Sequence, residues 1–125
     1  MPQIMLVSDK PDTFQELAET LQEDTGTDIR WARDGQTALN RACAKDGPDL
    51  VIFDETVAGT RGLDWIRRIM AVNAFVQTAV LSRLPRDAFH EASEGLGILA
   101  RLPPAPGRED ALELLKALRQ LPGVA

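Results

Sequence analysis

The order of apolar and polar residues along the chain predicts short strands that alternate with amphipathic helices. Apolar runs at 4–7, 50–53, 78–81 and 97–100 are expected to be buried strands, and the alternating stretch 28–32 is expected to be an edge strand. Apolar residues at helical spacing predict a helix after each strand. The expected helices begin near Pro11, Asp34, Gly62 and Ala88, and the last runs from about Glu109 to Leu121, before Pro122-Gly123.

Five strand–helix units in succession predict the fold class α/β, with a doubly wound parallel five-stranded sheet covered by helices on both faces. The central strand is expected at 50–53, because four apolar residues lie between Asp49 and Asp54. All strands of a parallel sheet end at the same edge. This edge is expected to gather five residues: Ser8, Asp9, Asp54, Ser82 and Leu102.

Local signals predict how individual helices begin and what they bury. Thr13 and Glu16 have the spacing of a capping box, and Asp34 is placed to cap the second helix. Cys43 lies on an apolar helix face, so we expect a small buried hydrophobic residue there.

Composition and charge narrow the class of protein. At 125 residues we expect one domain, residues 1–125, and the net charge of −5 argues against a nucleic-acid-binding domain. No apolar run reaches the length of a membrane span, and the first residues do not resemble a signal peptide. One cysteine and one histidine exclude a zinc site and fit a reducing, cytoplasmic compartment.

The polar residues at the strand ends suggest phosphoryl chemistry. Two carboxylates, Asp9 and Asp54, would suit a hard divalent cation, and the Ser82 hydroxyl could bond an oxygen placed over Asp54. A carboxylate beside a metal can attack phosphorus and form an acyl phosphate. The alternative that Asp54 only caps the following loop stays open at this point.

Residues 3–121 resemble the receiver domain of bacterial two-component response regulators. The resemblance rests on the order and separation of 4–9, 48–54, Gly59-x-x-Gly62-Leu63, Val80-Leu81-Ser82 and Glu94-Gly95 followed by Pro103. It implies a flavodoxin-like (βα)5 fold with strand order 2-1-3-4-5. It further implies that Asp54 is the phosphoacceptor, that Asp9, Asp54 and the Thr56 backbone carbonyl hold magnesium, and that Ser82 is the switch hydroxyl.

The chain departs from the family at several positions. Ser8 stands where the family has the first of two adjacent acids, Leu102 where it has a lysine, and Leu99 where it has an aromatic switch residue. Arg83 occupies a position that usually holds a small residue and is a candidate substitute cation. We therefore expect weak magnesium binding, a damaged switch, and buried side chains at Leu99 and Leu102.

The resemblance implies a signalling module and not an enzyme. Its partners would be a histidine kinase or phosphotransfer protein, and a downstream protein on the face formed by the fourth helix, fifth strand and fifth helix; no nucleic acid or membrane is expected, and a homodimer is left open. The alternative is a receiver-like interaction module that works without phosphorylation. A haloacid-dehalogenase-type phosphatase would need an aspartate where Thr56 stands, and a flavin carrier would need a phosphate-binding loop in place of 8–11.

Overall fold

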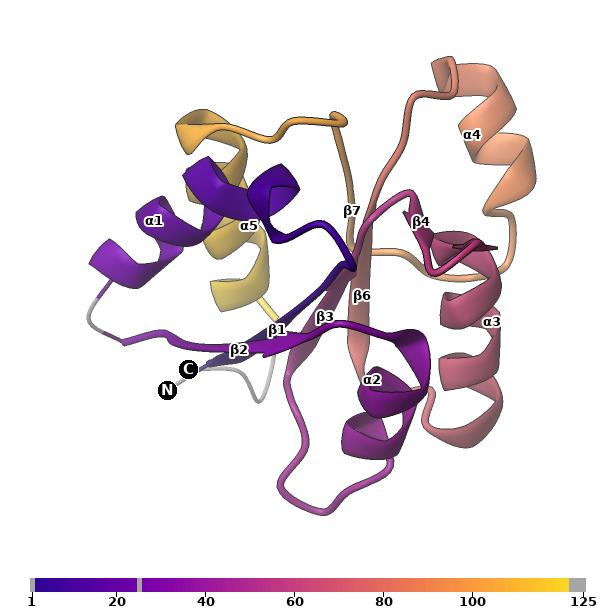
Figure 1. Ribbon diagram of the computed structural model, residues 1–125, viewed down its shortest axis with the longest axis horizontal. Helices are drawn as coiled ribbons and strands as arrows, with labels where there is room; N and C mark the ends of the chain where they lie inside the picture. The colour runs from indigo at the N-terminus through magenta and orange to yellow at the C-terminus, as the bar shows by residue number, and fades with distance from the viewer. Residues whose placement is uncertain (1, 25, 122–125) are drawn as a thin grey trace.

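The computed structural model describes residues 2–24 and 26–121, and in it five parallel strands form one sheet. The order is β2-β1-β3-β6-β7, which corresponds to 2-1-3-4-5 when only these five strands are counted (Figure 1). The strands are β1 (Gln3–Val7), β2 (Asp28–Ala32), β3 (Leu50–Phe53), β6 (Gln77–Leu81) and β7 (Ala100–Leu102). The predicted fold class and strand order are confirmed.

Helices cover both faces of this sheet (Figure 1). One apolar cluster joins one face of the sheet to α1 and α5, and a second cluster joins the other face to α2, α3 and Phe89 of α4. None of the described helices is long and apolar enough to cross a membrane. The helices are η1 (Pro11–Phe14), α1 (Gln15–Glu23), α2 (Gly35–Ala42), α3 (Gly62–Val72), α4 (Arg86–Ala92) and α5 (Arg108–Arg119).

The central strand β3 shows why the sheet is covered on both sides. Its four side chains are all fully buried, and they alternate between the two apolar clusters. Leu50 and Ile52 pack on the side of α1 and α5, whereas Val51 and Phe53 pack on the side of α2 and α3. This strand carries Asp54 at its carboxyl end, so the aspartate is attached to a rigid part of the fold.

The last strand lies later in the chain than predicted. The expected range was 97–100, whereas β7 pairs with β6 only from Ala100 to Leu102. Gly95 and Gly97 have φ angles of +82° and +60°, which are typical of turns that favour glycine. The apolar run therefore begins as a connection, and the Leu99 N–H, which donates to the Thr78 carbonyl at 2.8 Å, marks the start of sheet pairing.

The predicted capping box at Thr13 is wrong, whereas the predicted cap at Asp34 is confirmed. The chain makes a 3₁₀ turn over Pro11–Phe14 before α1 begins, and neither the turn nor the helix has a side-chain cap. The reason is that Thr13 lies inside the turn, where its N–H donates to the Lys10 carbonyl. By contrast, Asp34 accepts a 2.7 Å hydrogen bond from the Thr37 N–H.

Two further expectations need correction. Cys43 is exposed, because it follows the last residue of α2 and its side chain is not part of the helix face that packs on the sheet. The loop after Asp54 contains a short antiparallel hairpin, β4 (Thr56–Val57) and β5 (Thr60–Arg61), which was not predicted. The expected stop at Pro122-Gly123 lies outside the described residues.

Candidate functional site

Three polar side chains are buried together where β1, β3 and β6 end. Ser8, Asp54 and Ser82 have relative exposures of 1%, 9% and 5%. The Asp54 N–H donates to the Val7 carbonyl at 2.9 Å, which fixes the aspartate beside the end of β1. The Ser82 N–H donates to the Leu102 carbonyl at 3.0 Å, which fixes the serine beside the end of β7. The predicted edge therefore exists, and we call this group of ends the strand-end site.

Ser8 contacts the Asp54 carboxylate directly. The Ser8 hydroxyl lies 2.7 Å from Asp54 Oδ2, and Ser8 Oγ accepts a 2.9 Å hydrogen bond from the Lys10 N–H. The second carboxylate oxygen, Oδ1, accepts a 2.7 Å hydrogen bond from the Glu55 N–H. Each carboxylate oxygen has two lone pairs, so both oxygens can still accept a further partner. Asp54 therefore caps the following loop, and both of its carboxylate oxygens can still accept a further hydrogen bond or bind a cation.

Asp9 and Thr56 lie close in sequence to the residues of the strand-end site. Asp9 is exposed and directly follows Ser8, and Thr56 is the exposed first residue of β4. The loop that carries Thr56 is held by Gly62, whose N–H donates to the Glu55 carbonyl at 2.8 Å. A Cβ atom on Gly62 would lie 2.4 Å from the Asp54 carbonyl oxygen, so only glycine allows this close approach.

Arg83 points its polar groups at Glu55. Its backbone N–H donates to the Glu55 carboxylate, and its Nε lies 3.3 Å from Glu55 Oε1. The Arg83 side chain is 78% exposed, so this ion pair is solvated. Sequence reasoning missed Glu55, although an acid directly after Asp54 was a usable signal. A role for Arg83 as a substitute cation stays a prediction.

The last strand brings no cation to the site. Leu102 is only 4% exposed and packs in the cluster under α1 and α5, as predicted. Leu99 is partly buried and packs against the edge of the same cluster, so it is less enclosed than Leu102. The Arg101 guanidinium lies 5.6 Å from the centre of the Phe89 ring on α4.

The oxygen donors present fit a loosely held magnesium ion. Magnesium keeps several waters and binds through one or two carboxylates together with phosphate oxygens. By residue type, Asp9, Asp54 and the Thr56 carbonyl are oxygen donors of this kind, with one carboxylate fewer than an acid at Ser8 would give, and their role as ligands stays a prediction. Over residues 2–24 and 26–121, no group of three or more His, Cys, Asp or Glu side chains is placed to hold a metal ion.

Comparison with known proteins identifies a family. A family model described as response regulator receiver domain matches residues 4–98. A search of curated proteins gave no match.

Solved structures share the whole fold at low sequence identity. A two-component response regulator from Clostridium difficile is 18% identical, with a TM-score of 0.80, and the match covers 98% of this chain and 100% of that one. A chemotaxis response regulator from Vibrio cholerae is 24% identical, with a TM-score of 0.77 and coverages of 97% and 99%. The signal receiver domain of an HD domain-containing protein from Pseudomonas fluorescens is 25% identical, with a TM-score of 0.77 and coverages of 95% and 88%.

Proposed function

Because this chain belongs to the family of response regulator receiver domains, we propose that it accepts a phosphoryl group on Asp54 in a two-component phosphorelay. The observation that carries the proposal is the buried Asp54 at the end of β3, with the buried Ser82 at the end of the neighbouring strand β6. Receiver domains in general are signalling modules that interact with kinases or phosphotransfer proteins. We place this one, residues 1–125, in the cytoplasm as a single domain that turns over no diffusible substrate.

In the proposed reaction, an Asp54 carboxylate oxygen attacks the phosphorus of a phosphohistidine on a kinase or phosphotransfer protein. A P–O bond forms, the P–N bond breaks, and the imidazole leaves and takes up a proton. Ser8 orients the carboxylate through its 2.7 Å hydrogen bond. Asp9, Asp54 and the Thr56 carbonyl would hold a magnesium ion, which supplies positive charge against the phosphoryl oxygens.

Ser82 is suited to hold the product. Its Oγ accepts a 3.1 Å hydrogen bond from the Leu84 N–H, and its own proton has no acceptor among the described residues. That proton can be donated to a phosphoryl oxygen on Asp54. The buried Leu102 offers no positive charge to a phosphoryl group on Asp54, and Leu99 offers no large ring to move with Ser82. We therefore propose a weakened switch.

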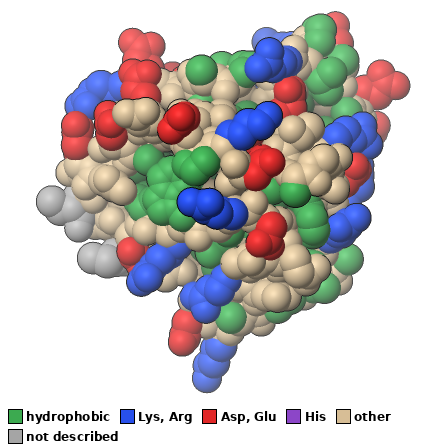
Figure 2. Space-filling model, in the orientation of Figure 1, with side chains coloured by type: hydrophobic (Ala, Val, Ile, Leu, Met, Phe, Trp, Pro, Cys, Tyr) green, Lys and Arg blue, Asp and Glu red, His purple; other side chains and the backbone are tan. Residues whose placement is uncertain are grey.

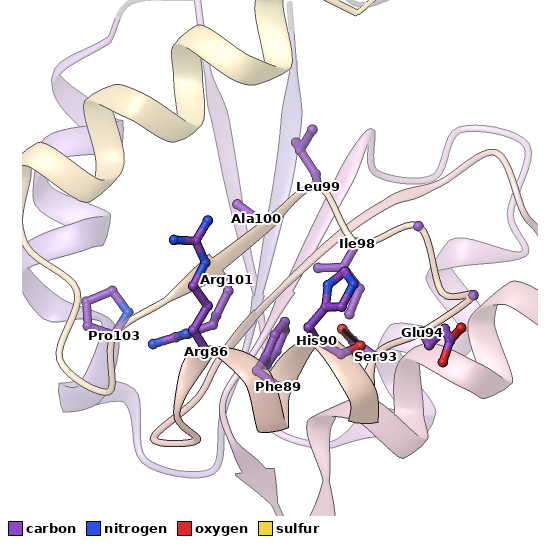
Figure 3. Close-up of a pocket in the computed structure, with 12 residues that line it drawn as sticks. Arg86, Phe89, His90, Ser93, Glu94, Ile98, Leu99, Ala100, Arg101 and Pro103 are labelled. Carbon is purple, nitrogen blue, oxygen red and sulfur yellow. Dashed lines mark hydrogen bonds between the residues drawn. The ribbon is translucent and has the colours of Figure 1, made fainter.

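A second candidate function is a receiver-like module that binds its partner without phosphorylation. The groove between α4 and β7 favours it, because this groove is already open in the unmodified chain and has a volume of about 590 Å³ (Figure 3). Figure 3 shows Phe89 and Ile98 at the groove, with Arg86 and Arg101 towards one end. A downstream protein, or a second copy of the chain, would contact this face in either candidate function.

Phosphorylation in solution separates the two candidates. Incubate the protein with acetyl phosphate and magnesium, and measure the intact mass and the acid and base lability of the adduct. We expect one phosphoryl group, and none in Asp54→Asn. Asp49→Asn is the matched control, because Asp49 flanks the other end of β3 and contacts the Gln3 N–H. If the protein stays unphosphorylated both with acetyl phosphate and with a phosphohistidine donor, only the second candidate function remains.

A further inference from the structure

The outer edge of β2 carries backbone groups that no other strand pairs. In the register of β1 and β2, Asp28 donates its N–H to the Pro2 carbonyl, and the Ala32 carbonyl accepts from the Ser8 N–H. Successive residues of a strand point these groups to opposite sides. Ile29 and Trp31 therefore direct their N–H and C=O groups away from β1, and none of the described residues hydrogen-bonds them.

The side chains of β2 alternate between the two sides of this edge: Trp31 lies on the α1 side with Phe14, and Arg30 lies on the α2 side, where Arg41 is. Trp31 is 43% exposed, and its ring meets the buried Phe14 edge-on at a centroid distance of 6.4 Å. A shallow hollow of about 600 Å³ lies along the edge. We call it the β2 edge surface; it is lined by Met5, Ile29, Arg30, Trp31, Thr37 and Arg41. Figure 2 shows exposed hydrophobic side chains in this part of the molecule with Lys and Arg side chains next to them.

The charge of this surface is opposite to that of the protein. The chain carries a net charge of −5, yet the charged residues that line the hollow are two arginines. Arg30 pairs with Asp28 at 3.1 Å in an exposed ion pair, and Arg41 has no ion pair within the described part of the chain. Arg33 and Asp34 lie just beyond the strand, but the Asp34 carboxylate is already engaged as the cap of α2.

We propose that the β2 edge surface binds an acidic polypeptide segment in extended conformation, which adds a strand beside β2. The partner backbone would pair with Ile29 and Trp31, since added strands take their affinity from main-chain hydrogen bonds. Its carboxylates would meet Arg41 and Arg30, and its apolar side chains would pack on Trp31. This site is independent of Asp54 and of phosphorylation, so it stands or falls separately from the proposed function.

The test uses eight-residue peptides that alternate glutamate and valine, titrated into the isotopically labelled full chain. Amide NMR shifts report binding, and we expect the largest changes at Ile29 and Trp31. A peptide with lysine in place of glutamate should not bind. A glutamate peptide with alternate backbone nitrogens methylated should not bind either, because it cannot donate to the edge.

Matched variants test the role of charge. Arg41→Glu should weaken binding about fivefold or more, since an exposed ion pair becomes a repulsion. Lys45→Glu makes the same change of net charge just beyond α2 and should leave the affinity unchanged. Lys45 is suited to this control because it is exposed, does not line the hollow and has no ion pair in residues 2–24 and 26–121.

Four results would overturn the proposal: no binding of the glutamate peptide, equal binding of the lysine peptide, equal binding of the methylated peptide, or equal weakening by Lys45→Glu. Sedimentation equilibrium tests the other candidate occupant of this edge, which is a second copy of the chain. A dimer of the free protein that Arg41→Glu dissociates would assign this edge to a second copy of the chain and would also overturn the proposal.

Discussion

Ser8 takes the place of an acid and contributes a hydrogen bond where the family has a second negative charge. Its hydroxyl donates to the Asp54 carboxylate and its oxygen accepts from the Lys10 N–H. Two adjacent carboxylates would repel each other in this buried place and would need a cation to relieve them. A serine gives the Asp54 carboxylate a hydrogen-bond donor without a metal, and we expect it to leave a weaker site for magnesium.

Ser8→Ala should lower the free energy of unfolding by about 1–3 kcal/mol, because it leaves a buried carboxylate oxygen without its donor. Urea denaturation measures the change. Ser93→Ala is the matched control, since the Ser93 hydroxyl makes only a 3.5 Å contact with the His90 carbonyl at the surface. The control should stay within about 0.5 kcal/mol of the parent. An equal loss of stability in Ser8→Ala and Ser93→Ala would mean that the hydrogen bond between Ser8 and Asp54 stabilises the fold no more than a surface contact does.

Ser8→Asp should strengthen magnesium binding, because it adds the missing carboxylate to Asp9 and Asp54. Calorimetric titration with magnesium measures the affinity. Without the metal, this variant should also unfold at a lower urea concentration than the parent, owing to repulsion from Asp54, and magnesium should restore it. Ser8→Asn adds the same volume without charge and should show neither effect. Tight magnesium binding by the parent chain, with no gain in Ser8→Asp, would contradict the prediction.

At the residue scale, the sequence predicted where the polar side chains lie but not which partners they take. The position of Asp54 follows from an apolar run that ends in a carboxylate. The pairing of Glu55 with Arg83 joins residues 28 positions apart through a loop, and no periodic pattern reports such a contact. The prediction of a buried Cys43 was wrong for a related reason, because helical periodicity does not show at which residue a helix ends.

At the scale of elements, an ion pair joins the end of α1 to the last turn of α5. Asp24, just after α1, bonds the Arg119 guanidinium in the last turn of α5. This contact with Arg119, and a hydrogen bond from the Thr27 hydroxyl, hold the pKa of Asp24 below its usual value. A lowered pKa stabilises the fold at pH values above the unfolded value of about 3.9, and this contribution is lost as the pH falls through the folded value.

Asp24→Asn should therefore reduce the thermal stability most at neutral pH, and the difference from the parent should shrink as the pH falls below about 4. Thermal unfolding between pH 7 and pH 3 measures it. The control is Glu23→Gln, because the Glu23–Arg108 ion pair also joins α1 to α5 but both side chains are more exposed, at 61% and 58%. A difference for Asp24→Asn that is constant with pH would show that the contact is not electrostatic.

Gly35 determines how closely α2 approaches α3. A Cβ atom there would lie 2.0 Å from the Trp65 ring, so Gly35→Ala should displace the indole and destabilise the fold by about 1–3 kcal/mol. Gly26→Ala is the control, because its Cβ would meet nothing closer than 3.7 Å. Trp65→Leu should recover part of the loss in the Gly35→Ala background, as measured by urea denaturation. No recovery would mean that the cost comes from the backbone of α2.

Element type was easier to predict than element boundaries. The buried strand at 50–53 and the cap at Asp34 were predicted because an unbroken apolar run and a capping residue are local signals. The start of β7 was misplaced by three residues, because the pairing with β6 and the two left-handed glycines determine it. The 3₁₀ turn before α1 was missed because proline opens both kinds of helix equally well.

At the scale of the whole molecule, the fold could be predicted because alternating strands and helices admit few topologies. A conformational switch needs, besides the fold, contacts that differ between its two states. A modification shifts an equilibrium only by its different interaction with the two states. Here a phosphoryl group on Asp54 would find the Ser82 hydroxyl but neither a lysine at 102 nor an aromatic ring at 99.

We therefore expect phosphorylation of Asp54 to leave the conformation nearly unchanged. One hydroxyl bond contributes about 0.5–1.5 kcal/mol, or up to about 3 kcal/mol to a charged oxygen, whereas moving a population from 1:99 to 99:1 takes about 5.5 kcal/mol. Amide NMR spectra before and after acetyl phosphate should differ only at the strand-end site. In Leu102→Lys the changes should spread to α4 and α5, and in the control Leu102→Met they should not. Spread in the parent chain would contradict this and would point to Arg83, released from Glu55, as the cation that takes the place of the lysine.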